Sequence, residues 1–318
     1  MNLPLVHIII LNWNGLNDTS ECLASIKKLT YPNVHVQVID NASKNGEAEI
    51  IEKRFPEVEV LKQTENLGFC GGCNAGMKKA LAENADFVML LNNDAIVSPN
   101  LIETLLEEYE KLENPGAVSP IIFKYPETKK IWFSIAKWEA VWKTGEAKFR
   151  LVLDENYEEL KSRKPYPTEF ACGCCLFIST RVIKEVGMFD ERYFAFYDEA
   201  EWCVRMKRRG FTSYIVPSAF IYHKVGGSTP SLVSTYLLNR NRLLWIAENL
   251  SFGQKVRSYP VMAKEFVWHL LNAGKLIPER KRYIPRERSR AFLQGYKDYF
   301  LRRFGKWGKE TEKVIFRK

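Results

Sequence analysis

The chain has 318 residues, of which 46% are hydrophobic and 27% are charged, and its net charge is +9. This composition is typical of a globular protein and excludes collagen, a whole-chain coiled coil and intrinsic disorder. No apolar run approaches the 18 or so residues of a membrane-spanning helix, and the amino terminus lacks the basic start of a signal peptide. We therefore expect a cytoplasmic protein, either soluble or held peripherally at the inner face of the cell membrane.

Charge is divided unevenly along the chain. Residues 231–318 hold 20 Lys and Arg against 7 Asp and Glu, whereas residues 1–230 hold 27 against 31. A strongly basic carboxy-terminal region therefore follows a mildly acidic body, and we place a domain boundary near Pro230. The seven cysteines are an odd number, which favours reduced thiols in the cytosol.

The first 120 residues alternate strand and helix patterns. This alternation predicts an α/β fold with a mostly parallel, Rossmann-like sheet and flanking helices. Asp18 or Thr19 is expected to cap the first helix. A near-continuous apolar run, typical of a strand buried on both sides, covers residues 6–11, and further strands are predicted over residues 34–39, 58–61 and 87–91.

Polar residues follow three of these strands. Asn12 ends the first strand, Asp40 ends the second, and Asn92, Asn93 and Asp94 end the fourth. Ligands bind at the carboxyl ends of strands in open α/β sheets, so we expect these side chains on one rim. The oxygens of Asp94 and Asn92 suit a hard cation such as Mg²⁺ or Mn²⁺. The alternative is an ordinary turn, because Asn and Asp are common at strand ends.

Beyond residue 120 the pattern is less regular, and residues 123–168 allow no assignment. A helix predicted over residues 198–209 begins with the acids Asp198, Glu199 and Glu201, after an aromatic run. A carboxylate in such surroundings can act as a general base toward a hydroxyl. Acids are also favoured at any helix amino terminus by the helix dipole, which is the alternative explanation.

A single histidine, His223, follows a strand predicted over residues 211–216. It is either structural or a second ligand for the cation at Asp94, since neutral imidazole suits Mn²⁺. After Pro230 the pattern is helical only, with helices predicted over residues 236–250, 260–271 and 285–304.

Two other patterns point less clearly to a site. The glycine-rich stretch 66–76 lacks the Gly-x-Gly-x-x-Gly order of dinucleotide-binding proteins, which disfavours a dehydrogenase. Its glycines instead allow a close approach of the backbone, for example to a sugar nucleotide. The pair Cys70-x-x-Cys73 has zinc-finger spacing, but the other cysteines do not, so buried thiols are the better explanation.

Together these segments resemble glycosyltransferase family 2 with the GT-A fold, and especially the bacterial rhamnosyltransferases that build surface polysaccharides. The resemblance covers most of residues 5–230 and depends on the order and spacing of short motifs. These are Ile10-Leu11-Asn12-Trp13-Asn14-Gly15, Val38-Ile39-Asp40-Asn41-Ala42-Ser43, Asn66-Leu67-Gly68-Phe69 with Gly71-Gly72 and Asn74, Leu91-Asn92-Asn93-Asp94, Gly187-x-Phe189-Asp190-Glu191-x-Tyr193-Phe194, the acidic cluster with Arg205, and His223-x-x-Gly226-x-Ser228.

The resemblance implies how a nucleotide-sugar donor is held. Asp40 would contact the base or the ribose, with Asn12 near it. Asp94 would bind Mn²⁺ or Mg²⁺ on the donor diphosphate, and His223 would complete the metal site. Further donor contacts are expected from Asn66, Gly68, Asn92 and Asn93.

The resemblance also implies a catalytic base. The family's Glu-Asp pair, whose second acid is the base, falls on Asp198 and Glu199. This sequence departs from the family in two places. Asn92 replaces the first Asp of the usual Asp-x-Asp motif, which leaves Asp94 as the one charged ligand there. Glu199 stands where Asp is usual, so either Asp198 or Glu199 can be the base.

These expectations define an inverting, metal-dependent glycosyltransferase that works by single displacement. The first candidate donor is dTDP-rhamnose, and the acceptor is a glycan or a lipid-linked saccharide. The region 1–230 would be the GT-A catalytic domain, and residues 231–318 a basic helical extension.

The alternative function is a non-catalytic protein that binds sugar nucleotides or nucleic acid through the basic tail, where cations and aromatics alternate. We expect no nucleic-acid partner.

The last predicted helix combines a basic and an aromatic face. Such a helix can lie on an anionic membrane, or its aromatics can dock on the protein while the cations stay in water. The aromatic positions are Phe292, Tyr296, Tyr299, Phe300 and Phe304.

Overall fold

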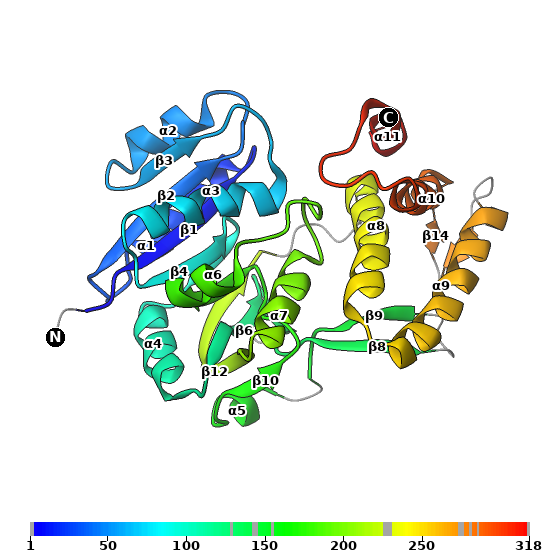
Figure 1. The fold of residues 1–318 in the computed structure, drawn as a ribbon. Helices are drawn as coiled ribbons and strands as arrows, with labels where there is room; N and C mark the ends of the chain where they lie inside the picture. Colours follow the sequence, from blue (N-terminus) through cyan, green and yellow to red (C-terminus); the bar gives the residue numbers. More distant parts are fainter. Residues whose placement is uncertain are drawn as a thin grey trace. The chain divides into compact units, whose positions relative to one another are not determined.

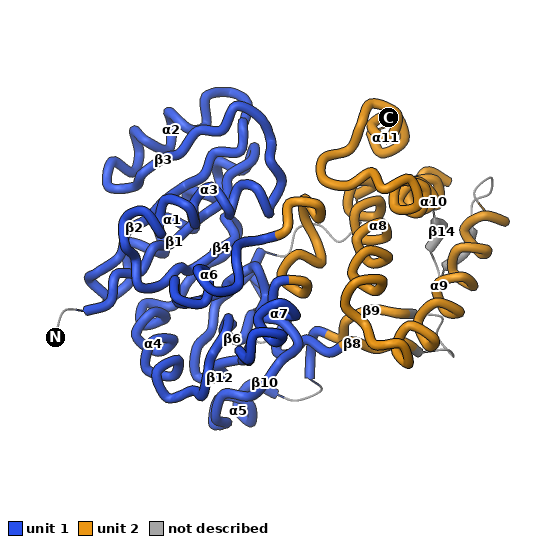
Figure 2. The backbone as a smooth tube through the Cα atoms, in the orientation of Figure 1, with its two compact units in different colours: residues 1–137, 151–189, 202–226 blue, residues 138–150, 190–201, 227–318 orange. Residues whose placement is uncertain are grey.

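The computed structural model describes residues 3–127, 130–141, 146–153, 156–224, 231–272, 277–279, 282–284 and 286–316. Contacts divide the chain into two compact units, each with its own packing (Figure 2). Unit 1 comprises residues 1–137, 151–189 and 202–226, and unit 2 comprises residues 138–150, 190–201 and 227–318.

Unit 1 is built on a large mixed sheet with helices packed against it, which confirms the predicted α/β class (Figure 1). The parallel part has the strand order β4-β1-β2-β3, and antiparallel β11 joins it to β6 and β12. The strands are β1 (Val6–Asn12), β2 (Val34–Asp40), β3 (Glu59–Lys62), β4 (Phe87–Asn92), β5 (Ala95–Val97), β6 (Pro115–Lys124), β7 (Ile131–Phe133), β10 (Tyr166–Thr168), β11 (Cys175–Ser179) and β12 (Thr212–His223).

The first four helices of unit 1 follow the alternation predicted for residues 1–120, and three more described helices lie beyond it. These helices are α1 (Leu16–Ile26), α2 (Glu47–Arg54), α3 (Gly68–Ala82), α4 (Leu101–Lys111), α5 (Tyr157–Leu160), α6 (Thr180–Val186) and most of α7 (Asp198–Arg208). The predicted cap of α1 is wrong: Gly15 precedes the helix, and both Asp18 and Thr19 lie inside it.

The glycine-rich stretch is explained by packing of α3 on β1. A Cβ atom at Gly72 would lie 2.2 Å from a methyl carbon of Leu11, and one at Gly76 would lie 2.6 Å from Ile9. Both distances are shorter than real carbon contacts, so only glycine lets the helix approach the strand this closely. Gly68 starts α3 with φ at +71°, a conformation that glycine adopts without strain.

Unit 2 is mainly helical, and its described secondary structure includes two small hairpins. Its elements are β8 (Lys137–Val141) paired with β9 (Glu146–Arg150), β13 (Ile277–Glu279) paired with β14 (Arg282–Ile284), and the helices α8 (Leu232–Asn249), α9 (Phe252–Asn272), α10 (Arg286–Phe300) and α11 (Lys309–Ile315). Helix α9 begins eight residues before the predicted start and contains Pro260. Among the described helices, no segment combines the length and the hydropathy that crossing a bilayer requires.

Within unit 2, a buried arginine of α8 binds the segment that precedes α7. The guanidinium of Arg240 donates to the carbonyl oxygens of Arg192, Tyr193 and Gly305 at 3.2, 3.1 and 2.7 Å. The neighbouring Asn241 amide donates to the same Tyr193 carbonyl and to two further ones, those of Ala195 and Phe196. These bonds hold a strained backbone, since three residues there have left-handed φ angles: Phe194, Phe196 and Tyr197.

The aromatic face predicted for the last long helix is partly occupied by packing inside unit 2. Phe292 of α10 is buried and stacks on His269 of α9, with ring centres 3.9 Å apart. Tyr296 is buried beside Phe266. In contrast, Phe300 at the end of α10 is 71% exposed. Two of the five aromatics thus serve helix packing.

We expect Gly295→Ala to destabilise unit 2. A Cβ atom at Gly295 would lie 2.7 Å from the carbonyl oxygen of Tyr236, where α10 meets α8, and a backbone atom cannot move aside cheaply. Such overpacking costs about 1–3 kcal/mol, so the midpoint of thermal unfolding should fall by several degrees. The control is Gly253→Ala in α9, whose added Cβ meets nothing within 4 Å. An equal loss in both variants would contradict the proposed steric cause.

Candidate functional site

A chain of hydrogen bonds links the ends of three strands in unit 1. The Asn12 amide donates to Asp40 Oδ1 at 3.0 Å, and the Thr19 hydroxyl donates to Asn12 Oδ1 at 2.7 Å. The Asn93 amide in turn donates to Thr19 Oγ1 at 3.0 Å. The parallel register makes this possible, because Asn12 lies opposite Asp40 and Leu11 lies opposite Asn92. The predicted shared rim of strand ends is therefore present.

Asn12 is the centre of this chain and has no exposed surface. Its amide nitrogen also lies 3.0 Å from Ser43 Oγ and from Glu47 Oε2. The other oxygen of Asp40 accepts from the Ser43 backbone N–H at 3.1 Å. The Asp40 carboxylate is thus fixed from both sides. Thr19, Ser43 and Glu47 were not predicted as part of this network, because local sequence gives no sign of their long-range partners.

Asn66 and Gly68 lie at the start of α3 and are tied to the residue after β2. The Asn41 amide donates to Asn66 Oδ1 and to the Gly68 carbonyl, each at 3.0 Å. Asn41 Oδ1 accepts from the Leu67 backbone N–H at 2.9 Å. These bonds place residues 66–68 beside the end of β2, on the same rim as Asp40.

Asp94 and His223 lie together, although 129 positions separate them in the sequence. Strands β5 and β12 pair in antiparallel register with His223 opposite Ala95, and the Lys224 N–H donates to the Asp94 carbonyl at 2.9 Å. As a result, His223 Nε2 lies 3.0 Å from Asp94 Oδ1. Strand β12 is longer than predicted and ends at His223. Gly226 and Ser228 of the predicted motif lie outside the described residues.

The chemistry of this pair fits a divalent cation. Asp94 Oδ1 is buried, and no described residue makes a hydrogen bond to it; the same holds for His223 Nδ1. A buried carboxylate oxygen without a hydrogen bond is costly unless something else satisfies it. A carboxylate oxygen with an imidazole nitrogen is a donor set that Mn²⁺ accepts. Mg²⁺ relies more on oxygen ligands and on water.

The acidic cluster at the start of α7 belongs to unit 2. Asp198 is 1% exposed, so its carboxyl group is almost fully removed from water. Burial, followed by the nearby Glu199 carboxylate, raises the pKa of Asp198 well above its ordinary value. Glu199 is half-buried, and Glu201 is buried. The two adjacent acids therefore differ in environment, with Asp198 favouring its protonated form.

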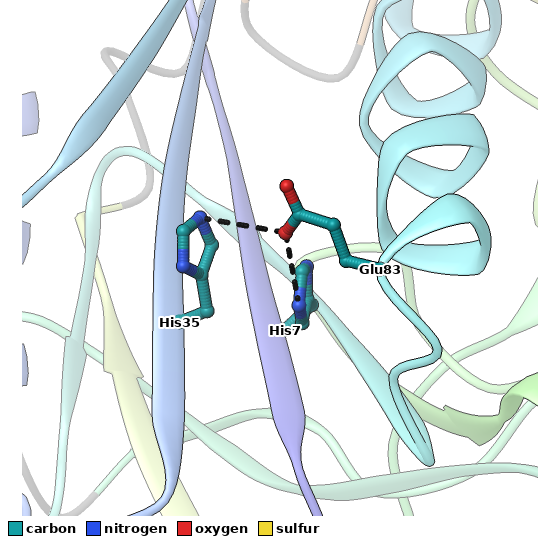
Figure 3. Close-up of side chains that lie close together, drawn as sticks. All are labelled: His7, His35 and Glu83. Carbon is teal, nitrogen blue, oxygen red and sulfur yellow. Dashed lines mark ion pairs between the residues drawn. The ribbon is translucent and has the colours of Figure 1, made fainter.

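A second group of possible metal ligands was not predicted. His7 Nε2 and His35 Nε2 lie 3.6 and 4.0 Å from the same oxygen of Glu83 (Figure 3). The Lys79 ammonium already pairs with the other oxygen of Glu83 at 2.5 Å. His7 lies five residues, or roughly 16 Å, along β1 from Asn12. This cluster is therefore at the opposite end of the strands from the rim described above.

We expect Asp198→Asn to stabilise the protein at neutral pH. The raised pKa means that the folded state holds the Asp198 proton more tightly than the unfolded chain does. Stability is therefore lost as pH rises above about 4, the ordinary pKa of an aspartate. The thermal midpoint of the variant should exceed that of the parent at pH 7, and the difference should shrink toward pH 4. A pH-independent loss of stability would show that Asp198 is not held protonated.

Comparison with known proteins identifies the family. The model for glycosyl transferase family 2 matches residues 7–187. An N-acetylglucosaminyl-diphospho-decaprenol L-rhamnosyltransferase of Mycobacterium tuberculosis (strain CDC 1551 / Oshkosh) is 27% identical over 248 residues, which cover 70% of this chain and 77% of that protein. The dTDP-rhamnosyl transferase RfbF of Shigella flexneri is 23% identical over 294 residues, which cover 88% and 90%.

The solved structure of GalNAc-T7 with UDP, GalNAc and Mn²⁺ has a TM-score of 0.60 at 17% identity. The match covers 85% of this chain, which spans only 57% of that one. Such a likeness shows the fold, which is the GT-A fold predicted from the sequence. Since the family model matches more than half of the chain, the protein belongs to glycosyl transferase family 2 and is a glycosyltransferase.

Proposed function

We propose that the protein transfers a sugar, with inversion, from a nucleotide-sugar donor to a glycan or a lipid-linked saccharide. The first candidate donor is dTDP-rhamnose. Two relatives support this choice, since one is named a dTDP-rhamnosyl transferase and the other a rhamnosyltransferase of a decaprenol-linked acceptor. Family membership favours catalysis over the alternative of a non-catalytic sugar-nucleotide or nucleic-acid binding protein.

The rim of unit 1 is the proposed donor site. Asp40 contacts the base or the ribose, and Asn12, which is fully buried, acts by fixing the Asp40 carboxylate rather than by touching the donor. Asn66 and Gly68 border the same strand end. Asn93, which bonds to Thr19, positions the turn that carries Asp94, and Asn92 completes the donor contacts.

The observation that carries the proposal is the pair formed by the buried His223 and the half-buried Asp94. Asp94 Oδ1 lies 3.0 Å from His223 Nε2 yet has no hydrogen bond from the described residues. These two side chains would hold Mn²⁺ or Mg²⁺. The cation supplies Lewis-acid stabilisation of the negative charge that gathers on the leaving nucleoside diphosphate.

Glu199 is the proposed general base. The acceptor hydroxyl oxygen forms a bond to the anomeric carbon while the bond from that carbon to the diphosphate oxygen breaks. The hydroxyl proton passes to the Glu199 carboxylate, and the nucleoside diphosphate departs with the electron pair. Asp198 is the weaker candidate because its raised pKa favours the protonated form, which cannot accept a proton. We therefore assign catalysis to residues 1–230, which contain the proposed donor site and the proposed base.

Asp94→Ala should abolish metal-dependent donor binding, because the diphosphate charge then lacks its cation. His223→Ala should weaken it less, since water can replace one neutral ligand. Calorimetry of dTDP-rhamnose and other nucleotide sugars, with and without Mn²⁺, measures both effects. Glu83→Gln is the control, because it removes a carboxylate at the opposite strand ends. If Asp94→Ala binds donor as the parent does, the cation site lies elsewhere.

Glu199→Gln should leave donor affinity nearly unchanged and reduce turnover by roughly 10²- to 10⁴-fold, the usual effect of a positioned general base. The amide keeps the shape of the side chain but cannot take the proton. Turnover is followed by release of the nucleotide, and affinity by the same calorimetry. Normal turnover in this variant would move the base to Asp198.

A further inference from the structure

Helix α9 of unit 2 carries a continuous apolar stripe on its exposed side. The stripe residues follow one another at intervals of four, three, eight, three and one positions, and the exposed Ala263 lies within the interval of eight. At roughly 100° per residue, all of them fall on about one third of the helix circumference. Their exposed fractions range from 41% to 84%. The stripe consists of Phe252, Val256, Tyr259, Val267, Leu270 and Leu271.

The stripe is not the side by which α9 packs into unit 2. The opposite side is buried, with Ser258, Val261, Met262 and His269 facing inward. His269 stacks on Phe292 of α10. Helix α9 is therefore apolar on two sides, one of which the protein itself covers. Contiguous exposed apolar surface of this kind marks an interaction site more often than single exposed residues do.

Charge around the stripe is positive. Glu265 is the one acidic residue in the sequence of α9, and it pairs with Arg242 at 2.6 Å on the inner side. Three basic residues accompany the stripe along the helix: Lys255, Arg257 and Lys264. The surrounding region, residues 231–318, has 20 basic and 7 acidic residues. The partner that this surface fits is therefore apolar in its interior and negatively charged at its surface.

We propose that the α9 stripe docks on an anionic lipid bilayer, lying in the plane of the interface with its apolar side chains in the headgroup boundary. An apolar helix face bordered by Lys and Arg is the arrangement that such interfacial helices use. Phe252 and Tyr259 add aromatic rings, which favour the membrane interface. The choice of lipid over protein draws on the proposed function, since a lipid-linked acceptor lies at a membrane.

This surface replaces the last long helix as the membrane-binding element. Phe292 and Tyr296 of α10 are buried against α9, so they cannot insert into a bilayer while unit 2 is folded. The aromatic side of α10 and the inner side of α9 instead form one packed layer. That packing leaves the outer side of α9 free to contact lipid.

The test is flotation of the full chain with two kinds of vesicle, in the absence of donor and acceptor. One kind is phosphatidylcholine alone, and the other is phosphatidylcholine mixed with phosphatidylglycerol. The parent should bind the anionic vesicles more tightly, by about fivefold for each cation near the surface. In the triple variant Val256→Gln, Val267→Gln, Leu270→Gln, the affinity for anionic vesicles should fall by more than about tenfold. All three side chains are exposed, so the fold should survive, which circular dichroism checks.

The matched control is the double variant Phe300→Gln, Leu301→Gln, which removes two exposed apolar side chains at the end of α10. It should bind vesicles like the parent; the reverse pattern would assign the contact to α10. Failure of the parent to bind either vesicle would overturn the proposal. A protein that dimerises through α9 and does not bind vesicles would overturn it as well. Donor hydrolysis, measured in parallel, reports separately on the proposed function.

Discussion

The buried amide of Asn12 is the interaction on which the candidate donor site depends. It lies at the end of the strand between β2 and β4, and it joins Asp40 on one side to Thr19 and Asn93 on the other. Inside a protein a satisfied polar network is strong, and an unsatisfied member is costly. The parallel register therefore does more than pair the strands, because it also sets the positions of the side chains that follow each strand.

Much of this arrangement could be predicted from the sequence, for a physical reason. Strands buried on both faces require nearly continuous apolar residues, so β1 and β4 are visible as runs that stop at polar residues, whereas β2 is indicated by alternating valines before Asp40. Parallel strands in an α/β sheet present their carboxyl ends at one edge. The position of Asp40 beside Asn12 follows from these two rules. The short distance between Asp94 and His223 does not, since it needs the antiparallel pairing of β5 with β12.

Other features depend on contacts that no local pattern records. Glu47 accepts from Asn12 although it lies in α2, and Thr19 donates to Asn12 although it was expected to cap α1. The sequence of adjacent acids does not show that Asp198 is buried more deeply than Glu199, because burial is a property of the folded unit. Likewise, the aromatic spacing of α10 is compatible with packing and with lipid binding. The choice between them is set by α9, whose two apolar sides the sequence alone does not distinguish.

The bonds from Arg240 and Asn241 to the segment before α7 have an evolutionary consequence. The strained backbone of residues 193–197 and the acids that follow it draw their support from a helix more than 30 positions further along the chain. Recombination that replaced residues 227–318 as a block would part this segment from its arginine, even if every acid were retained. Lineages that exchange the carboxy-terminal helices must therefore inherit the 190–201 segment with them.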